Sequence, residues 1–504
     1  MKITASSPFL YTASEVYALD AAAIAGGIPS IQLMKRAGRA AFELLVERFP
    51  AAELVSVYCG AGKNGGDGYV LAALAAQRLL PVQVIQLTAP DKLTGEARQA
   101  YDFALQEGVR MLPFAQAAAP EGGVIVDALL GIGLRGAPTG EFVQAIEQIN
   151  QSRLPVLALD IPSGLNADTG ATAGVAVHAQ ITIPFIALKR GLLTGRGPAL
   201  AGELVLANLD VPAATYDVVA PSAERLVLNG LIGLLAPRSA DAHKGDFGHV
   251  MVIGGDTGMG GAALMAAEAA ARTGAGNVSI ATRPEHVAAI LARRPEVMAC
   301  GVVSGQELEP LLARPTLLVV GPGLGRSPWS EQMLQQAVKS GLPLVLDADA
   351  LNILAEGRVI PVANRQQHSS WLLTPHPAEA ARLLGITTAE VQADRFAAVR
   401  ALSERYNSSV ILKGAGSLVA GIHGQETNEL VGVVTDGNPG MASGGMGDVL
   451  SGIVGGLVAQ GLSAADAARL GAVVHACAAD LAAEDLGQRS LLATDLIPYL
   501  GQLL

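Results

Sequence analysis

Short apolar runs alternate with longer amphipathic segments through the first part of the chain. The runs are rich in Val, Ile and Leu, which predicts buried strands. The longer segments have helix-like sequence, and strand–helix–strand at this spacing predicts right-handed crossovers and a mainly parallel sheet. Strands are expected at residues 54–59, 82–87, 123–127 and 155–160, and helices at residues 69–80 and 95–106.

The pattern loosens at residues 212–221, which hold two prolines and no clear period. We therefore expect a domain boundary there, with a first domain at residues 1–215 and a second at residues 222–504. The alternation then resumes, and no short repeat is found. Strands are expected at residues 249–253, 317–320, 344–347, 371–374 and 410–412, and helices at residues 260–272 and 447–459.

The composition favours layered α/β domains. Of 504 residues, 50% are hydrophobic but only 4% are aromatic, and 59 glycines supply tight turns. The net charge of −11 and the lack of a Lys/Arg block argue against nucleic-acid binding. Three scattered cysteines do not form a disulfide framework or a zinc site. The sequence shows no signal-peptide core and no uncharged run of membrane-spanning length, so we expect a cytoplasmic protein.

Two unlike glycine-rich segments carry the candidate chemistry, one at residues 60–68 and one at residues 440–448. Each follows strand-like sequence, ends near an acid and leads into an apolar helical run. Free N–H groups at a helix N-terminus attract phosphate through the unpaired donors and the helix dipole. The pair predicts two sites, each for a phosphate-bearing ligand.

The first segment has neither the dinucleotide fingerprint nor the P-loop pattern. It could be a tight turn with a helix-capping Asp67. Two further turns follow predicted strands, at residues 131–136 and 160–166. Arg135 adds a guanidinium that can grip phosphate, although alone it would more often be a surface residue. Because the carboxyl ends of parallel strands meet at one sheet edge, the three turns are expected to converge on one ligand.

This half resembles the YjeF N-terminal family, which has a Rossmann-like fold and epimerises C6 of hydrated NADH or NADPH. The matching segments are 33–38, 64–68, 127–133 and 160–164. Lys63 departs from the family, which often has a second asparagine there. The resemblance implies a potassium ion held by Asn64, Asp127 and Ser163, and Asp160 at the nicotinamide end. It also implies a phosphate cradle made by Asn64, Gly65, Gly66, Asp67, Gly68, Gly131, Ile132, Gly133, Leu134, Arg135, Gly136 and Ala137.

Epimerisation of a carbinolamine carbon needs reversible loss of hydroxide or ring opening beside nitrogen, so a proton-transferring group must lie close to it. Asp160 is the candidate for this role, with Asp127 better placed for the metal. The alternative for Asp160 is a carboxylate that only caps its turn.

In the second half, Asp448 opens a predicted helix rich in small residues. The N–H groups there could stabilise a phosphoryl group in transfer while Asp448 accepts a proton from an attacking hydroxyl. The turn at residues 413–417 suits a nucleotide phosphate. His376 lies between two prolines at a strand end, where a ligand role competes with a purely structural one. Lys244 is either a phosphate contact or a solvated charge.

The second half resembles the YjeF C-terminal, or CARKD-type, family, which has a ribokinase-like fold and dehydrates the S epimer of the hydrate with ADP, giving NAD(P)H, AMP and phosphate. The matching segments are 244–245, 321–325, 346–351, 374–377 and 447–448. The resemblance implies hydrate contacts from Ala263, Gly323, His376 and Asp448, with the glycine of the 321–325 loop chosen as its central one. Nucleotide contacts are implied for Lys413, Gly414, Ala415, Gly416, Ser417 and Gly447.

The two halves together resemble the two-domain arrangement of the NAD(P)H-hydrate repair family. This implies the hydrates and ADP as small-molecule substrates, K⁺ in the first domain, Mg²⁺ with ADP in the second, and self-association. One alternative is a ribokinase-like kinase that phosphorylates a small alcohol, such as a vitamin precursor, fused to a nucleotide-binding domain. A second alternative is a nucleotide sensor without turnover, which would need no proton acceptor at Asp448.

Overall fold

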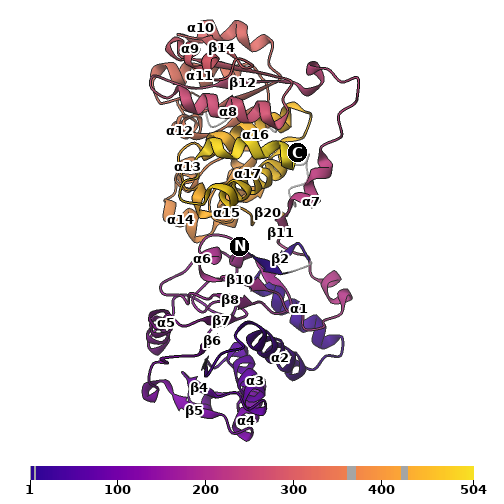
Figure 1. The fold of residues 1–504 in the computed structure, drawn as a ribbon, viewed down its shortest axis with the longest axis vertical. Coiled ribbons are helices and arrows are strands. Elements are labelled where there is room, and N and C mark those ends of the chain that lie inside the picture. The colour runs from indigo at the N-terminus through magenta and orange to yellow at the C-terminus, as the bar shows by residue number, and fades with distance from the viewer. Residues whose placement is uncertain (1, 5–6, 360–369, 422–429) are drawn as a thin grey trace. The chain divides into compact units, whose positions relative to one another are not determined.

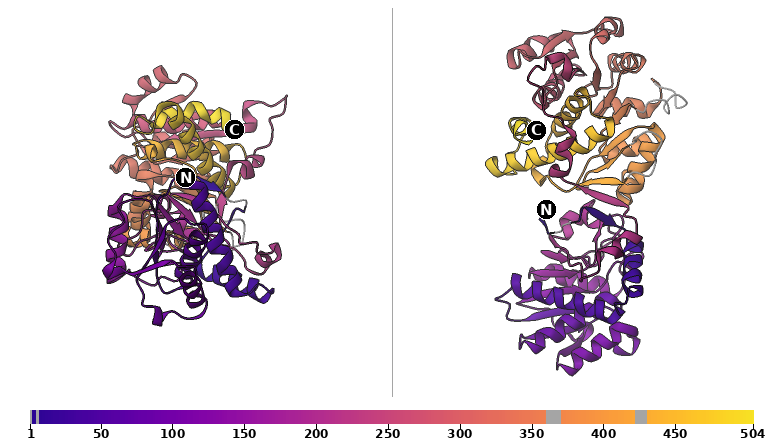
Figure 2. Two further views of the ribbon diagram at one scale, coloured as in Figure 1. Left: turned by 60° about the horizontal axis from the view of Figure 1, so that its bottom comes forward. Right: turned by 90° about the vertical axis from the view of Figure 1, so that its right-hand side faces the viewer.

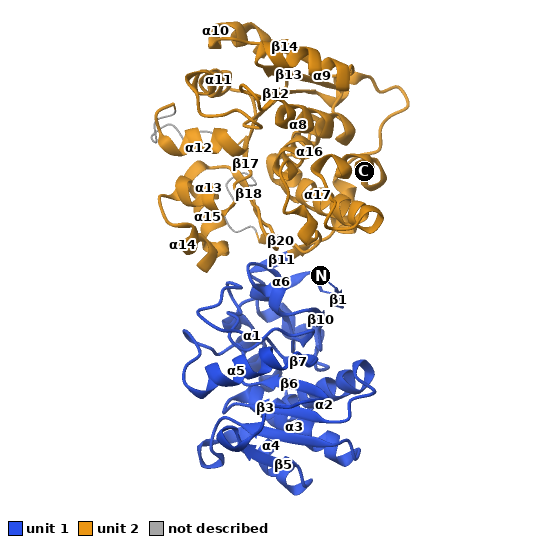
Figure 3. Ribbon diagram, turned by 60° about the vertical axis from the view of Figure 1, so that its left-hand side comes forward, with its two compact units in different colours: residues 1–224 blue, residues 225–504 orange. Residues whose placement is uncertain are grey.

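The computed structural model describes residues 2–4, 7–359, 370–421 and 430–504. The chain forms two compact units, residues 1–224 and 225–504, which Figure 3 colours separately. Each unit is one continuous stretch of chain, as the colour order along the ribbon shows (Figure 1, Figure 2). The first unit runs beyond residue 221 because Ala223 and Glu224, at the start of strand β11, pair with strand β2.

The first unit is built on a parallel sheet with the strand order β1-β10-β8-β7-β6-β3-β4-β5. The strands expected near residues 54–59, 82–87, 123–127 and 155–160 are β3, β4, β6 and β7. Strands β4 and β5 are added on one side of β3, and β6 and β7 are added on the other side. The order in which the chain adds strands therefore reverses between β5 and β6, and the switch point lies between the neighbouring strands β3 and β6. The strands are β1 (Ile3–Thr4), β3 (Val55–Cys59), β4 (Val82–Gln86), β5 (Arg110–Pro113), β6 (Val124–Ala128), β7 (Val156–Leu159), β8 (Ile181–Ile183) and β10 (Glu203–Val205).

Helices cover both faces of this sheet, as expected for three layers. One face carries Val57 and Val84 and packs on helices α1 to α4; the other carries Tyr58 and Ile85 and packs on α5. A short ladder that is not part of this eight-stranded sheet joins β2 (Phe9–Tyr11) to β9 (Leu188–Lys189) and β11 (Ala223–Leu226). The helices are α1 (Ala13–Ala25), α2 (Ser30–Arg48), α3 (Lys63–Gln77), α4 (Gly95–Gln106), α5 (Glu141–Ser152) and α6 (Gly197–Leu200).

The glycine-rich segment after β3 is helical rather than a loop, because α3 begins at Lys63 instead of Tyr69. Its glycines allow close packing. A β-carbon at Gly65 would lie 2.1 Å from the carbonyl oxygen of Gly60, and one at Gly68 would lie 2.6 Å from the Ala128 side chain. The glycine run therefore brings the first turns of α3 against the ends of β3 and β6, where the helix N-terminus meets the site.

Gly65→Ala is expected to destabilise the first unit by about 3 kcal/mol, since the new methyl group would overlap backbone oxygen that cannot move aside. Gly62→Ala is the matched control, because a β-carbon there meets nothing within 4 Å. Thermal unfolding of both variants measures the difference. Equal melting temperatures would show that the helix can shift without cost.

The second unit has a larger sheet with the order β14-β13-β12-β15-β16-β17-β18-β19-β20. The strands from β14 to β18 are parallel, and β19 and β20 are antiparallel additions. The strands are β12 (His249–Ile253), β13 (Asn277–Thr282), β14 (Met298–Gly301), β15 (Leu317–Val320), β16 (Leu344–Leu346), β17 (Trp371–Leu373), β18 (Ser409–Leu412), β19 (Leu418–Ala420) and β20 (Val431–Val434).

Helices α8, α16 and α17 pack on one face of this sheet in a large apolar core, and α11, α12, α13 and α15 lie on the other (Figure 3). The small residues of α16 permit close contact: a β-carbon at Gly452 would lie 2.1 Å from the Ala266 carbonyl oxygen on α8. The helices are α7 (Leu228–Leu231), α8 (Gly260–Thr273), α9 (Val287–Arg293), α10 (Gly305–Leu308), α11 (Pro328–Lys339), α12 (Ala348–Glu356), α13 (Pro377–Leu384), α14 (Thr388–Ala393), α15 (Arg395–Tyr406), α16 (Met446–Ala459), α17 (Ala464–Leu486) and α18 (Leu500–Leu503).

In the part of the chain that the structure describes, no single helix is both long and apolar enough to cross a membrane. Only α1 and α2 taken together, with a bend of 117° between them, meet the length and composition of a span.

Two candidate active sites

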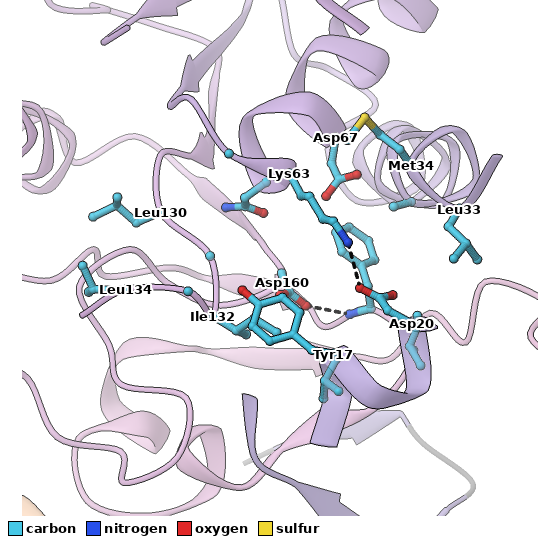
Figure 4. Close-up of a pocket in the computed structure, with 18 of the residues that line it drawn as sticks. Tyr17, Asp20, Leu33, Met34, Lys63, Asp67, Leu130, Ile132, Leu134 and Asp160 are labelled. Atoms are coloured by element: carbon cyan, nitrogen blue, oxygen red, sulfur yellow. Dashed lines mark hydrogen bonds and ion pairs between the residues drawn. The ribbon is translucent and has the colours of Figure 1, made fainter. Parts of the chain in front are cut away.

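The first unit contains a pocket of about 520 Å³ at the carboxyl ends of its central strands (Figure 4). Residues after β3, β6 and β7 line it, namely 62–64, 129–135 and Asp160. The order of strand addition reverses at the neighbouring parallel strands β3 and β6, and open α/β sheets bind ligands at such switch points. The three turns expected to converge therefore do so.

The predicted potassium ligands Asp127 and Ser163 lie in direct contact. The Ser163 hydroxyl donates to Asp127 Oδ1 at 2.6 Å, and the Ser163 N–H donates to Oδ2 at 2.8 Å. Burial raises the pKa of Asp127 to about 6, although these hydrogen bonds act in the opposite direction. A buried carboxylate with this tendency to take up a proton would be stabilised as an anion by a nearby cation.

The third predicted ligand, Asn64, is buried, and neither side-chain polar atom has a hydrogen-bond partner among the described residues. It packs on the loop after β6, where a β-carbon at Gly131 would lie 3.2 Å from the Asn64 β-carbon. Leu130, which precedes Gly131 in this loop, donates its N–H to the Ser163 hydroxyl at 2.9 Å. An unpaired buried carboxamide is costly, and a cation bound to its oxygen would remove that cost.

Asp160 stands at the pocket wall with one oxygen fixed. Its Oδ1 accepts hydrogen bonds from the Phe185 N–H at 3.1 Å and from the Lys189 ammonium, and its backbone φ is +64°. The Asp160 carboxylate is therefore paired with a buried lysine, which the turn-capping alternative does not require. Lys189 was not predicted as the partner of Asp160, because the pair joins two segments that are distant in the sequence.

Helix α1 adds two polar residues that the sequence analysis also missed, Tyr17 and Asp20 (Figure 4). The Lys63 ammonium lies 3.3 Å from Asp20 Oδ2, so the residue that departs from the family forms an ion pair at the pocket. Burial, together with the charges of Asp160 and Asp20, raises the pKa of Asp67 well above its usual range. The pocket wall thus carries Asp20, Asp67 and Asp160 beside Lys63, and Lys189 is buried behind Asp160.

The expected phosphate cradle is only partly on the pocket wall. Asn64, Asp67, Gly131, Ile132, Gly133, Leu134 and Arg135 line the pocket. Gly65, Gly66 and Gly68 are instead buried in helix packing, and Gly136 and Ala137 are exposed beyond the lining residues. The role of this second group stays a prediction.

In the second unit, three neighbouring strands end in a buried polar network. Asp347 follows β16, Thr374 follows β17 and Lys413 follows β18. The Lys413 ammonium lies 2.8 Å from Asp347 Oδ1, which also accepts the Thr374 hydroxyl at 2.8 Å. Ser451 on α16 donates to Asp347 Oδ2 at 2.8 Å. Because of these partners, the pKa of Asp347 is lowered despite its burial.

This network lies beneath the start of α16. A β-carbon at Gly447 would lie 3.1 Å from the Lys413 ammonium nitrogen and 3.4 Å from Asp347 Oδ2. The Lys413 side chain therefore points under the helix N-terminus, and its positive charge adds to the helix dipole there. Contact of the 413–417 turn with a nucleotide stays a prediction, and within that turn only backbone and the Ser417 hydroxyl are suited to it.

Asp448 lies in the first turn of α16, half-buried at the edge of this network. Burial and the nearby Asp347 charge raise the pKa of Asp448 to about 7, while Lys413 acts in the opposite direction. The carboxylate is therefore neither packed in hydrocarbon nor fully solvated. A pKa near 7 suits a general base at neutral pH.

His376 is the N-cap of α13, and its Nδ1 accepts hydrogen bonds from the Ala378 and Glu379 N–H groups at 3.1 and 3.3 Å. Its Nε2 lies 3.2 Å from Glu379 Oε1. Burial and the Lys413 charge lower the pKa of His376, so the ring is neutral at pH 7 with its proton on Nε2. About half of the side chain is exposed, which leaves a face for a ligand.

Gly323 and Ala263 lie where the 321–325 loop packs on the start of α8. Gly323 has φ of +57°, and a β-carbon there would lie 2.5 Å from the Met259 carbonyl oxygen, so only glycine fits. Ala263 is fully buried, so a contact with the hydrate would require movement of the residues above it. Both contacts stay predictions.

Comparisons with known proteins agree with the families that the sequence of each half resembles. A sequence model described as YjeF-related protein N-terminus matches residues 30–191, and one described as NAD(P)H-hydrate dehydratase matches residues 250–502. The bifunctional NAD(P)H-hydrate repair enzyme Nnr of Coxiella burnetii is 48% identical over 97% of this chain and 98% of its own. The proteins of that name from Vibrio cholerae and Escherichia coli are each 42% identical over 95% of this chain and 94% and 90% of theirs. The chain therefore belongs to the bifunctional NAD(P)H-hydrate repair enzymes, with an epimerase unit followed by a dehydratase unit.

Proposed function

We propose that the second unit phosphorylates the C6 hydroxyl of the S hydrate from ADP and then eliminates phosphate to regenerate NADH or NADPH. The observation that carries this is Asp448, a half-buried carboxylate with a pKa of about 7 at the N-terminus of α16. Asp448 removes the hydroxyl proton as the oxygen attacks the β-phosphorus of ADP, and AMP leaves. The C6–O bond then breaks with its electron pair on phosphate while the ring nitrogen lone pair forms a C6–N1 double bond. Loss of the C5 proton to the departing phosphate then places the double bond between C5 and C6 and returns the lone pair to nitrogen.

The start of α16 is suited to hold the phosphoryl group in transfer. The N–H groups that follow Gly445 have no partner within the helix, and they point to where negative charge develops. Gly447 leaves this approach free of a side chain, and Lys413 supports it from below. Asp347 neutralises and fixes Lys413 rather than touching the substrate.

Mg²⁺ is expected to arrive with the nucleotide rather than to reside in the protein. The described residues contain no cluster of three or more His, Cys, Asp or Glu side chains able to hold a metal. Mg²⁺ in phosphoryl transfer is commonly bound through substrate phosphates and one or two carboxylates, which agrees with this arrangement.

We propose further that the first unit interconverts the R and S hydrates, with Asp160 transferring a proton at the C6 oxygen. Loss of water requires a proton on the departing oxygen, while the ring nitrogen lone pair forms the C6–N1 double bond. Addition of water to the other face returns the proton to Asp160. The pocket admits the substrate and its apolar wall limits bulk water around the reacting carbon.

The residues around Asn64, Asp127 and Ser163 fit a potassium ion, which would supply a fixed positive charge at the phosphate end of the pocket. Raising KCl at constant ionic strength, with tetramethylammonium chloride as the balance, is expected to stabilise the first unit by about 2.7 kcal/mol at a hundredfold excess over Kd. Thermal unfolding measures this. Asp127→Asn should abolish the shift, and Asp102→Asn, an exposed carboxylate, should keep it. Equal stabilisation in both variants would argue against this site.

One assay separates this function from a small-alcohol kinase. Purified protein is given mixed R and S hydrate with ADP, Mg²⁺ and K⁺, and the absorbance of reduced nicotinamide and the phosphorus products are followed. Full recovery of reduced cofactor with AMP and orthophosphate is expected. Recovery of only the S fraction would show an inactive first unit, and a stable phosphorylated product would favour the kinase. We also expect the enzyme to be cytoplasmic and to self-associate. Cell fractionation tests the location, and light scattering tests the oligomeric state.

A further inference from the structure

A fully buried lysine lies behind the first pocket. Lys189 is in the short strand β9, and its side chain is 0% exposed. A buried ammonium is costly unless an anion and hydrogen-bond acceptors compensate it. An apolar residue at this place would avoid that cost, so the charge calls for a role beyond packing.

The Lys189 ammonium fixes one half of the Asp160 carboxylate. It forms an ion pair with Asp160 Oδ1 and donates to the Phe185 carbonyl oxygen at 2.9 Å, while the Phe185 N–H donates to the same Oδ1 at 3.1 Å. No described residue donates a hydrogen bond to Oδ2, and Asp160 lines the pocket with 13% of its side chain exposed. The carboxylate thus has a fixed oxygen toward β9 and a second oxygen available to a ligand.

The backbone also directs this side chain. Asp160 has φ of +64°, a left-handed conformation that residues with a β-carbon adopt only where the surroundings enforce it. Its N–H is held by the Ile183 carbonyl oxygen at 2.9 Å. The Lys189 pair and the backbone therefore restrict Asp160 to one orientation at the pocket wall.

Several charged groups face Asp160 from the neighbouring elements. Asp67 and Lys63 come from α3, Tyr17 and Asp20 come from α1, and Arg135 follows β6. Lys63 pairs with Asp20 and is 54% exposed, so it is screened by solvent. Among the described residues, Lys189 is the cation that contacts Asp160 without access to water.

We propose that Lys189 is a positioning residue of the epimerase: its ammonium holds one oxygen of the Asp160 carboxyl group so that the other oxygen can exchange a proton with the hydrate. The inference rests on the proposed role of Asp160. The lysine keeps its own proton throughout, because the proton moves between Asp160 and the C6 oxygen and returns, with no net transfer.

The test uses the full chain, whose dehydratase unit serves as an internal control. Lys189→Met is expected to lower kcat for R-to-S conversion by about 10²-fold, a typical general acid–base contribution, with KM changed less than threefold. A purely structural role would instead lower the melting temperature of the first unit or raise KM together with the loss of kcat. Turnover of the pure S hydrate should stay unchanged. Lys92→Met, at an exposed position, is the matched control and should keep both activities.

Two more variants keep the outcome decisive if Lys189→Met destabilises the first unit. Lys189→Gln retains an N–H donor without charge and should be as slow as Lys189→Met, whereas Lys189→Arg should recover much of the rate. A wild-type kcat in Lys189→Gln, beside an inactive Asp160→Asn, would overturn the inference about Lys189. An active Asp160→Asn would instead remove the proposed role of Asp160 itself.

Discussion

Asp448→Asn is expected to lower kcat for dehydration of the S hydrate by about 10³-fold, because the amide cannot accept the proton of the attacking hydroxyl. The substitution keeps the size of the side chain and its place in the first turn of α16, so binding of hydrate and ADP should change only a few-fold. Steady-state kinetics with isothermal titration calorimetry separates the two effects. Epimerisation by the same protein should be unaffected, which reports on folding.

The pH dependence of dehydration by the wild-type protein is a second test of the role of Asp448. Burial and the Asp347 charge raise the pKa of Asp448 to about 7. The ionised form is the one that accepts a proton, so kcat/KM for dehydration should fall as the pH decreases below 7 and level off above it. Asp448→Asn should lose this limb while retaining its low rate. A turnover near wild type, or an unchanged limb, would show that another group is the base.

The places of the candidate site residues at the sheet edge could be predicted from the sequence because these residues follow strand ends. Asp127 and Asp160 each end an apolar run, and parallel strands bring such residues to one edge. The strand-like and helix-like periods also gave the α/β class and the start of α16 to within one residue of Gly447. In the second half the same logic located Lys413 and His376.

Three features could not be predicted because they depend on packing between distant segments. The glycines at 65–68 are typical of a loop by local propensity, but they allow α3 to approach Gly60 and Ala128 closely. The partner of Asp160, Lys189, lies 29 residues away in a separate short strand. The direction of the Lys413 side chain likewise depends on Asp347, which comes from another strand. Tertiary contacts of this kind leave no periodic signal in the sequence.

Asp160→Asn is expected to slow R-to-S conversion of the hydrate by about 10³-fold and to leave dehydration of pure S hydrate intact. Asn is preferred to Ala for this test on structural grounds. Asn tolerates the left-handed backbone of Asp160 and keeps an acceptor for the Phe185 N–H, whereas Ala would leave the buried Lys189 ammonium without any side-chain acceptor there. Removing one partner of a buried ion pair costs about 3–5 kcal/mol, so Ala would confound catalysis with unfolding of the first unit.

The measurement starts from purified R hydrate with ADP in excess, so that each epimerised molecule is reported as reduced cofactor by the second unit. The wild-type protein should convert all of the R hydrate, and Asp160→Asn should show only the spontaneous rate. A residual rate close to wild type would mean that Asp160 only caps its turn. In that case Asp67, whose pKa burial raises well above its usual range, would be the next carboxyl group in the pocket to test as the proton donor.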